Sequence, residues 1–364
     1  ASTATYVDRY GIVKTAAVNT IREEKDGFLI EQAGTNIATY SEQLDNAAWT
    51  KVNGTVNVNA QTAPNGSLTM DEFEVTSVST VQGLSAPQFT SNGSSDTFSL
   101  FILKSLSNFD ALLYFRNSIG GGAMYATVTF NPFTGVVTES AGTEDYSVMD
   151  MGDYYRFSLT SSLIPAGLMR AHIRLQSLPI GSKIAVWGAQ IEQSLAATSY
   201  IPTAGSAVTR IADKALLPVL NNAVTKELSI FGIISNISSS TTGNKFIFSV
   251  PVLSGFLTLY YNAGNPNRYI FRYDDGISPA LASVNLSVNL RYFAATVDGS
   301  NITININGTE GSVSKIGDPS VLLADDITFF SYLNSTPAQA SGNIKDFRIY
   351  DFALNANEIE YLLP

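Results

Sequence analysis

Arginine, tyrosine and histidine side chains recur at alternate positions of several strand-like runs in the first half of the chain. Between residues 168 and 176 polar side chains alternate with apolar ones, so on a strand the two kinds face opposite ways. The polar set is Arg170, His172, Arg174 and Gln176. The same alternation turns five further side chains away from the apolar face of their runs: Tyr114, Arg116, Tyr125, Tyr154 and Arg156.

These residue types suit the recognition of sugars. Tyrosine rings stack on sugar C–H faces, and guanidinium groups bind carboxylates or vicinal hydroxyls through two parallel hydrogen bonds. If the strands share a sheet face, the pattern predicts a glycan-binding surface that prefers acidic sugars. A polar outer face or a subunit interface is the alternative interpretation. A second candidate glycan site, in the other half of the chain, comprises Arg268, Arg272, Tyr273 and Asp274.

The residues that would hydrolyse a sugar are sparse. Glycoside hydrolysis needs two carboxyl groups about 5–9.5 Å apart, and no strand-like run of the second half carries such a set on one face. His172 is the single histidine, so a serine–histidine–aspartate triad would have to use it. We expect Arg170 and Arg174, on the same face, to keep His172 protonated and unable to act as a base. The sequence therefore predicts a protein that is not an enzyme.

Acidic pairs in turn-like settings are the only candidates for metal binding. Asp274 and Asp275 precede Gly276, and Asp325 precedes Asp326. Ca²⁺ takes six to eight oxygen ligands from several segments, so each pair would supply part of a structural calcium site. Ordinary turn chemistry explains the same residues. No other cofactor is expected.

Composition restricts the classes of protein to which the chain can belong. The 364 residues include 21 Lys and Arg against 31 Asp and Glu, a net charge of −10, and no cysteine. The negative charge argues against a nucleic-acid partner, because such proteins neutralise phosphates with basic side chains. The absence of cysteine excludes disulfides, a thiol nucleophile and cysteine-ligated zinc. No run of about 18 apolar residues occurs, so no membrane insertion is expected.

The elements that must position these residues are short strands. Alternating apolar and polar runs separated by Gly, Pro and Asn turns predict an all-β fold with two antiparallel β-sandwich (jelly-roll) domains in tandem. A short C-terminal helix is expected where Asn355 caps and Glu358 completes a capping box. The predicted segments are 1–35, 36–203 and 204–364. We interpret the charged first segment as a solvated connector or as a strand docked on the first domain or on a neighbouring subunit.

The first half resembles phage virion proteins of the tail-fibre or spike type. Residues 36–50 are similar to the segment that opens their carbohydrate-binding-module-like jelly roll. Residues 4–11 and 27–31 resemble its lead-in, and residues 186–192 and 198–203 resemble its closing strand and exit.

The second half resembles a laminin-G/concanavalin A-like sandwich. Residues 292–300 and 302–308 form a hairpin pattern across Asp298 and Gly299, and residues 342–359 give a last strand before a short helix. This superfamily includes lectins, glycanases and structural domains, so the resemblance implies the fold of residues 204–364 and does not name a ligand.

Together the resemblances imply a structural virion protein that attaches to a host cell-surface glycan without cleaving it. Its other expected partners are virion proteins and further copies of itself, with a trimer favoured. A capsid decoration or collar protein whose sandwiches bind only virion proteins is one alternative. A glycan-cleaving depolymerase is the other.

Overall fold

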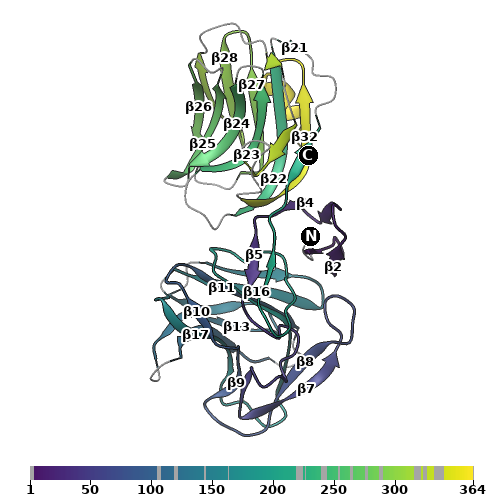
Figure 1. The fold of residues 1–364 in the computed structure, drawn as a ribbon, viewed down its shortest axis with the longest axis vertical. Helices are drawn as coiled ribbons and strands as arrows, with labels where there is room; N and C mark the ends of the chain where they lie inside the picture. The colour runs from purple at the N-terminus through teal and green to yellow at the C-terminus, as the bar shows by residue number, and fades with distance from the viewer. Residues whose placement is uncertain are drawn as a thin grey trace. The chain divides into compact units, whose positions relative to one another are not determined.

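A computed structural model describes residues 4–363 with several gaps in the chain. The gaps are 105–107, 119–121, 143–144, 163, 219–223, 226, 239–243, 253–254, 263–264, 275–277, 287–289, 315–320, 323–325 and 332–339. The expected all-β fold of antiparallel sheets with one short C-terminal helix is confirmed (Figure 1). The chain divides into two compact units, and each contains two separate stretches of sequence. Unit 1 comprises residues 1–20 and 34–211, and unit 2 comprises residues 21–33 and 212–364.

Unit 1 is a sandwich of two antiparallel sheets with a shared core. The groove sheet, named for the site described below, has the order β14 (Val137–Ala141), β13 (Met124–Phe130), β12 (Ala111–Asn117), β17 (Gly167–Leu175), β9 (Gln82–Ser85) and β6 (Thr50–Val52), and β10 (Phe89–Ser91) also pairs with β17. The opposing sheet has the order β15 (Asp145–Asp150), β16 (Tyr154–Ser161), β11 (Asp96–Leu103), β18 (Lys183–Glu192), β8 (Met70–Val75) and β7 (Gly54–Gln61).

Alternation builds this core. On β17 the apolar side chains Met169, Ala171, Ile173 and Leu175 are buried in it, as Phe157 and Leu159 of β16 are from the other sheet. The outer face of the opposing sheet has a second apolar cluster that includes Phe101, Trp187 and Tyr200. The hairpin of β1 (Ala4–Val7) and β2 (Val13–Ala16) contributes Val13 to that cluster. The short pair β5 (Gly34–Asn36) and β19 (Val208–Arg210) completes the unit.

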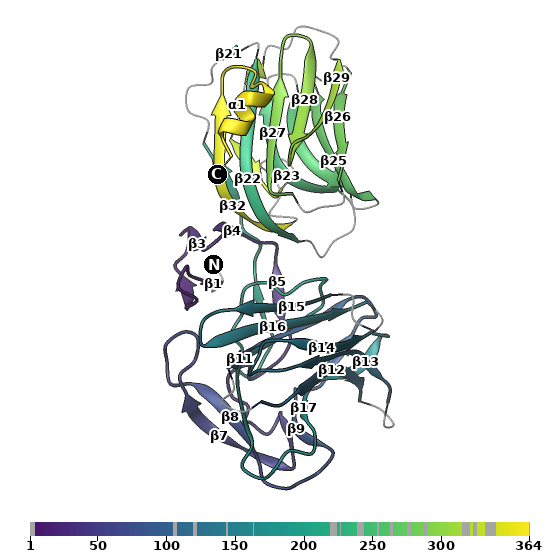
Figure 2. The ribbon, with the colours of Figure 1, turned by 180° about the vertical axis from the view of Figure 1, so that it is seen from behind.

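Unit 2 is also built from two sheets around one core (Figure 2). The first has the order β20 (Ala215–Leu217), β31 (Ile327–Phe329), β23 (Asn244–Val252), β24 (Gly255–Asn262), β25 (Asn265–Asp274) and β26 (Ala280–Asn285). The second has the order β29 (Thr309–Ser314), β28 (Asn301–Ile306), β27 (Tyr292–Val297), β22 (Leu228–Ser238), β32 (Ser341–Tyr350), β4 (Gly27–Ile30) and β3 (Arg22–Glu24). A short pair joins β21 (Val224–Thr225) and β30 (Val321–Leu322).

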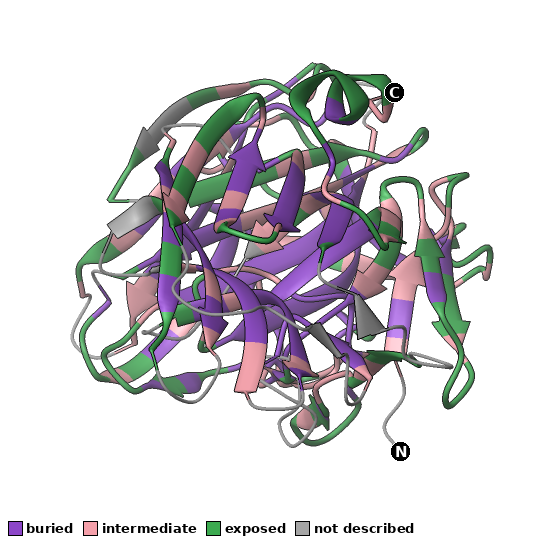
Figure 3. Ribbon diagram, turned by 90° about the horizontal axis from the view of Figure 1, so that it is seen from above, coloured by how far each residue is buried: buried purple, intermediate pink, exposed green. Residues whose placement is uncertain are grey.

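Local sequence signals account for the turns and the helix of unit 2. Asn307 and Gly308 both have positive φ, 50° and 86°, which suits the two-residue turn between β28 and β29. Helix α1 (Ala356–Tyr361) begins at Asn355, and Glu358 completes the capping box as the sequence predicts. Figure 3 shows buried strands inside the molecule and an exposed outer side of α1. Within the described part of the chain, no helix has the length and apolar character needed to span a bilayer.

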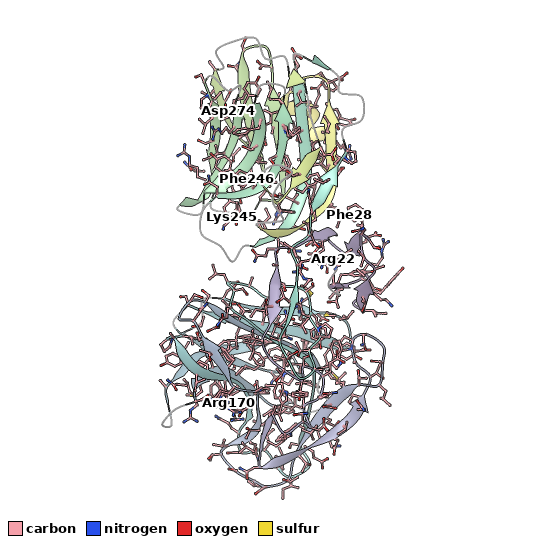
Figure 4. All side chains as sticks on the ribbon, in the orientation of Figure 1. Arg22, Phe28, Arg170, Lys245, Phe246 and Asp274 are labelled. Carbon is pink, nitrogen blue, oxygen red and sulfur yellow. The ribbon has the colours of Figure 1, made fainter. Side chains whose placement is uncertain are left out.

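The amino-terminal residues do not form a segment of their own. Residues 4–16 pair as a hairpin in unit 1, whereas β4 extends a sheet of unit 2 by pairing with β32. The Arg22 side chain, labelled in Figure 4, is 3% exposed and donates hydrogen bonds to the carboxylates of Glu31 and Asp213. This buried ion-pair network fastens residues 21–33 to the start of the second stretch of unit 2.

Candidate functional site

The outer face of the groove sheet collects most of the predicted glycan-binding residues. Tyr114 lies directly opposite His172 in the pairing of β12 with β17, and Arg116 lies opposite Arg170. Arg174 continues the same face of β17, and Gln176 follows the strand and is exposed. Figure 4 labels Arg170 on this unit. The structure therefore brings Tyr114, Arg116, Arg170, His172, Arg174 and Gln176 onto neighbouring strands of one sheet.

Part of this face is hollowed into a groove of about 400 Å³. Small-molecule sites in proteins measure roughly 300–1,000 Å³, so the groove is large enough for a sugar residue. Its lining comes from β12, β13, the end of β17 and the loop before β9: Thr80, Val81, Leu112, Tyr114, Arg116, Gly122, Met124, Arg174 and Gln176. None of these lining residues is a carboxylate.

His172 is held neutral beneath this surface. Its Nδ1 atom accepts a hydrogen bond of 2.7 Å from Nη2 of Arg174 and lies 3.0 Å from Oγ of Ser85. Burial, together with the positive charges of Arg174, Arg116 and Arg170, lowers the pKa of His172 to about 3. The expectation that the arginines keep His172 protonated is therefore wrong, because like charges and burial both disfavour the imidazolium.

The geometry around His172 does not suit general-base catalysis. An imidazole with a pKa of about 3 is a weak base at neutral pH, and its Nδ1 already accepts from Arg174. The ring stacks on Tyr114 with centroids 4.7 Å apart and planes 11° apart. His172 thus acts as a packing and hydrogen-bonding residue under the groove.

Arg174 is a buried cation without a carboxylate partner in the described part of the chain. Its side chain donates from Nη1 to the carbonyl of Leu84 and from Nη2 to Oγ of Ser85, each at 2.8 Å. The residue is 7% exposed, and none of the residues that the structure describes accepts a hydrogen bond from its Nε atom. Burial lowers the pKa of Arg174, and the charge of Arg116 adds to this effect.

The other two arginines of this face are half-buried, and each donates to neutral acceptors. Nε of Arg116 donates to the carbonyl of Gly122 at 3.1 Å. Nη1 of Arg170 donates to Oγ1 of Thr50 at 3.1 Å and to the carbonyl of Ala86 at 3.2 Å. No ion pair between described residues involves Arg170 or Arg174. The charges of Arg170 and Arg174 are therefore not compensated by a carboxylate in those pairs.

Tyr125 does not belong to this surface, contrary to the sequence-based prediction. A β-bulge shifts the pairing of β12 with β13, so that Tyr125 lies opposite the core residue Phe115 and packs against the core. Ala126 takes the extra place with φ of 46°. Met124 consequently lies opposite Arg116 and lines the groove in place of Tyr125.

Tyr154 and Arg156 also lie elsewhere, because β16 belongs to the opposing sheet. The hydroxyl of Tyr154 donates to the carbonyl of Thr62 at 2.8 Å. The guanidinium of Arg156 donates to the carbonyl of Thr198 and lies 5.4 Å from the ring centre of Phe101. Both side chains support the outer cluster of that sheet, so the prediction that they share the face with Arg170 is wrong.

The expected stacking role of Tyr114 is not supported by its surroundings. One face of its ring is covered by His172, and the residue is 5% exposed. Sequence reasoning also missed the aliphatic part of the lining, which is Val81, Leu112 and Met124. Leu112 carries an alternation signal, because it precedes Tyr114 by two residues on β12, but Val81 lies on a loop and Met124 precedes the bulge.

The alternative site in unit 2 is divided between the two faces of β25. Tyr273 is 2% exposed and belongs to the core, so its predicted surface role is wrong. Arg272 is paired with Asp274, which Figure 4 labels, and lies 4.9 Å from the ring centre of Phe256. Arg268 donates to Oγ of Ser283 at 3.3 Å. The charge of Arg272 is therefore compensated within the strand.

The predicted calcium sites lie partly outside the described residues, since these do not include Asp275, Gly276 or Asp325. Among the residues that the structure does describe, no group of three or more His, Asp and Glu side chains is arranged to hold a metal ion.

Comparison with known proteins bears mainly on unit 2. Residues 231–360 match the family model of the concanavalin A-like lectin/glucanases superfamily, which confirms the resemblance of the second half. No curated protein matches the chain. The resemblance of the first half to phage tail-fibre proteins stays a prediction.

Two solved structures of laminin chains also match. Domains LG4-5 of the mouse laminin alpha1 chain are 8% identical with a TM-score of 0.29, and the match covers 74% of this chain and 88% of that one. The LG1-3 region of the laminin alpha2 chain is 12% identical with a TM-score of 0.29, and the match covers 76% of this chain and 66% of that one.

Proposed function

We propose that this chain binds glycan without cleaving it, and that the groove of unit 1 is the binding site. The observation that carries the proposal is a groove whose described lining residues include two arginines and no carboxylate, in a protein of net charge −10. Guanidinium groups bind anions and hydroxyl groups through charge-assisted hydrogen bonds.

Two further observations support sugar as the ligand class. The lining combines hydroxyl, amide and guanidinium donors with aliphatic side chains, which matches the mixed polar and apolar surface of a pyranose. The similarity of residues 231–360 to a superfamily of lectins and glucanases fits a glycan-binding protein. The low pKa of His172 favours binding over hydrolysis by a histidine-dependent mechanism.

We further infer that the protein is a virion component of the tail-fibre or spike type, assembled as a trimer, which attaches phage to a host surface glycan. The resemblance of residues 4–11, 27–31, 36–50, 186–192 and 198–203 to such proteins supports this role. A decoration or collar protein would bind other virion proteins and no host sugar, and a depolymerase would shorten the sugar that it binds.

A glycan array probed with the whole chain separates these functions. We expect binding to a subset of bacterial surface glycans, and no release of reducing ends on prolonged incubation. Met124 is 55% exposed, so Met124→Glu should fold normally, place a carboxylate beside Arg116 and abolish binding. Leu68→Glu, at another exposed apolar position of unit 1, is the matched control and should bind normally. Binding that survives Met124→Glu would exclude the groove, and release of reducing ends would establish a depolymerase.

A further inference from the structure

Charged and aliphatic side chains alternate across the strands that line the groove. Arg174 lies directly opposite Leu112 in the pairing of β17 with β12, and Arg116 lies opposite Met124 in the pairing of β12 with β13. Val81, 47% exposed, adds a third aliphatic side chain from the loop before β9. Each guanidinium of the groove therefore has an aliphatic neighbour at the distance of one strand spacing.

The described lining of the groove offers no aromatic ring face to a ligand. Tyr114 is the one aromatic residue in that described lining, and its ring is stacked on His172 and 5% exposed. Flat sugar C–H faces are recognised by such aromatic faces, whereas small branched groups fit between aliphatic side chains. The apolar part of the ligand should therefore be a compact substituent, such as an acetyl or a methyl group.

The polar part of the groove carries positive charge on two adjacent strands. Half-buried Arg116 lines the groove beside Arg174, whose buried guanidinium is held by Leu84, Ser85 and His172 and adds its charge from beneath. A planar carboxylate matches the fork of a guanidinium. The net charge of −10 repels densely charged polymers such as nucleic acids, so one local carboxylate per sugar fits better than a run of phosphates.

We propose that the groove binds an acidic sugar that carries both a carboxylate and an acetyl or methyl substituent. The carboxylate lies on the side of Arg116 and Arg174, and the substituent contacts Leu112, Met124 and Val81. This inference rests on the proposed glycan-binding function and narrows its ligand class.

A panel of four sugar classes tests the inference with the whole chain. The panel contains several members of each class. The first class is sugars with both a carboxylate and an acyl or methyl group, such as N-acetylneuraminic acid oligomers, and the second is sugars with a carboxylate only, such as oligogalacturonate. The third is sugars with an acyl group only, such as chitooligosaccharides, and the fourth is neutral unsubstituted glucans. We expect the tightest ligands in the first class, by about 10-fold or more over each of the others, because only these sugars engage both the guanidinium groups and the aliphatic side chains. If the tightest ligand belongs to any other class, the inference is wrong but the proposed glycan-binding function still holds. No binding to any class would refute the proposed function itself.

Two substitutions test separately the contacts to the carboxylate and the contacts to the acetyl or methyl substituent. Arg116→Gln should weaken acidic ligands about 10-fold and leave neutral acylated sugars unchanged. Met124→Ser should reduce the preference for acylated over unacylated acidic sugars. Arg170→Gln is the matched control, because Arg170 lies opposite Arg116 on the same face but outside the groove lining. If Arg170→Gln lowers the affinity for acidic sugars as much as Arg116→Gln does, the placement of the carboxylate is wrong. If Met124→Ser leaves the preference for acylated sugars unchanged, the placement of the substituent is wrong. Circular dichroism of each variant establishes that it is folded.

Discussion

His172 is the only histidine of the chain, and three guanidinium groups raise the electrostatic cost of charging it. Its neutral ring gives Arg174 a hydrogen-bond acceptor and Tyr114 a stacking partner, so it supports both groove-lining residues from below. Arg174 is in turn anchored by Leu84 and Ser85 on β9. The charged part of the groove is therefore held rigidly before any ligand arrives, which limits the ordering cost of binding.

A titration of His172 tests this account directly. Because its folded pKa is about 3, we expect its ring to stay neutral from pH 8 to pH 4.5, with the proton on Nε2 because Nδ1 accepts from Arg174. The single histidine gives a single imidazole signal in NMR spectra of histidine-labelled protein. An inflection near pH 6.5, the ordinary value for histidine, would contradict the buried arrangement. Binding of an acidic sugar should likewise be insensitive to pH between 5 and 8.

Asp96 is a second buried titratable residue of unit 1, and it destabilises the fold when charged. It is fully buried; Ser91 donates a hydrogen bond to its Oδ2 atom, and its Oδ1 atom has no partner among the described residues. Burial raises the pKa of Asp96 from 3.8 to about 6. The folded state thus binds a proton more tightly than the unfolded state, so this residue's contribution to stability falls as pH rises from about 4 to 6 and is constant above.

Asp96→Asn should remove this penalty. We expect the variant to be more stable than the wild type at pH 7, by at most about 3 kcal/mol, and to differ little from it at pH 4. Chemical denaturation of both proteins at pH 4, 5 and 7 measures the difference, and the measurement at pH 4 serves as the internal control. A variant less stable at pH 7 than the wild type would show that the charged carboxylate is stabilised in the fold.

At the level of elements, strand alternation explains what the sequence predicts about the site and where it fails. Regular pairing of β12 with β17 places Tyr114, Arg116 and His172 on one face, as two-residue periodicity requires. The same periodicity misplaces Tyr125, because one extra residue at a bulge reverses the faces beyond it. Alternation predicts which side chains share a face of a strand but not the sheet to which the strand belongs, so the sequence pattern wrongly groups Arg156 of β16 with Arg170. The glycan-binding role of the remaining residues stays a prediction.

The bulge at Ala126 can be tested by stability. An L-residue with φ of 46° is strained by about 1 kcal/mol relative to glycine, and this strain offsets the loss of the buried methyl group of Ala126, about 0.8 kcal/mol. Ala126→Gly should therefore cost less stability than the same substitution in a regular strand, where the lost backbone restriction alone costs roughly 0.5–1 kcal/mol. Urea denaturation measures the difference. Ala111→Gly on the neighbouring strand β12 is the control and should destabilise.

The buried network at Arg22 ties two distant stretches of sequence into unit 2. Arg22 donates to the carboxylates of Glu31 and Asp213, and both carboxylates would lose their cation in Arg22→Ala. Breaking a buried ion pair by removing one partner costs about 3–5 kcal/mol, so we expect a loss of this size in unit 2. Lys345→Ala, an exposed position on β32, is the control and should change stability by less than 0.5 kcal/mol or so. A loss below about 1 kcal/mol for Arg22→Ala would exclude a structural role for the network.

At the scale of the whole molecule, the chain passes between the two units three times, so neither unit is one continuous stretch of sequence. The chain begins in unit 1, crosses to unit 2 for residues 21–33, returns for residues 34–211 and crosses again. Periodicity predicts the strands within both units, because each buries one face in its own core. It cannot predict that residues 28–30 pair with residues 342–344, because edge pairing depends on backbone groups that every strand shares.

This interleaving predicts that unit 2 needs residues 21–33 to be stable. A fragment of residues 212–364 leaves the β32 edge at residues 342–344 open and leaves Asp213 without Arg22. Residues 31 and 213 are neighbours, since the amide of Asp213 donates to the carbonyl of Glu31 at 2.8 Å, so a short glycine linker can join residue 33 to residue 212. The joined fragment should unfold at higher urea concentration and stay monomeric, whereas the fragment without residues 21–33 should aggregate through its exposed edge. Denaturation and light scattering compare the two fragments. A third sample, the joined fragment with Arg22→Ala, keeps β3 and β4 but removes the ion pairs of Arg22, so it separates the two contributions to stability. Equal stability and solubility of the first two fragments would mean that β3 and β4 do not stabilise unit 2.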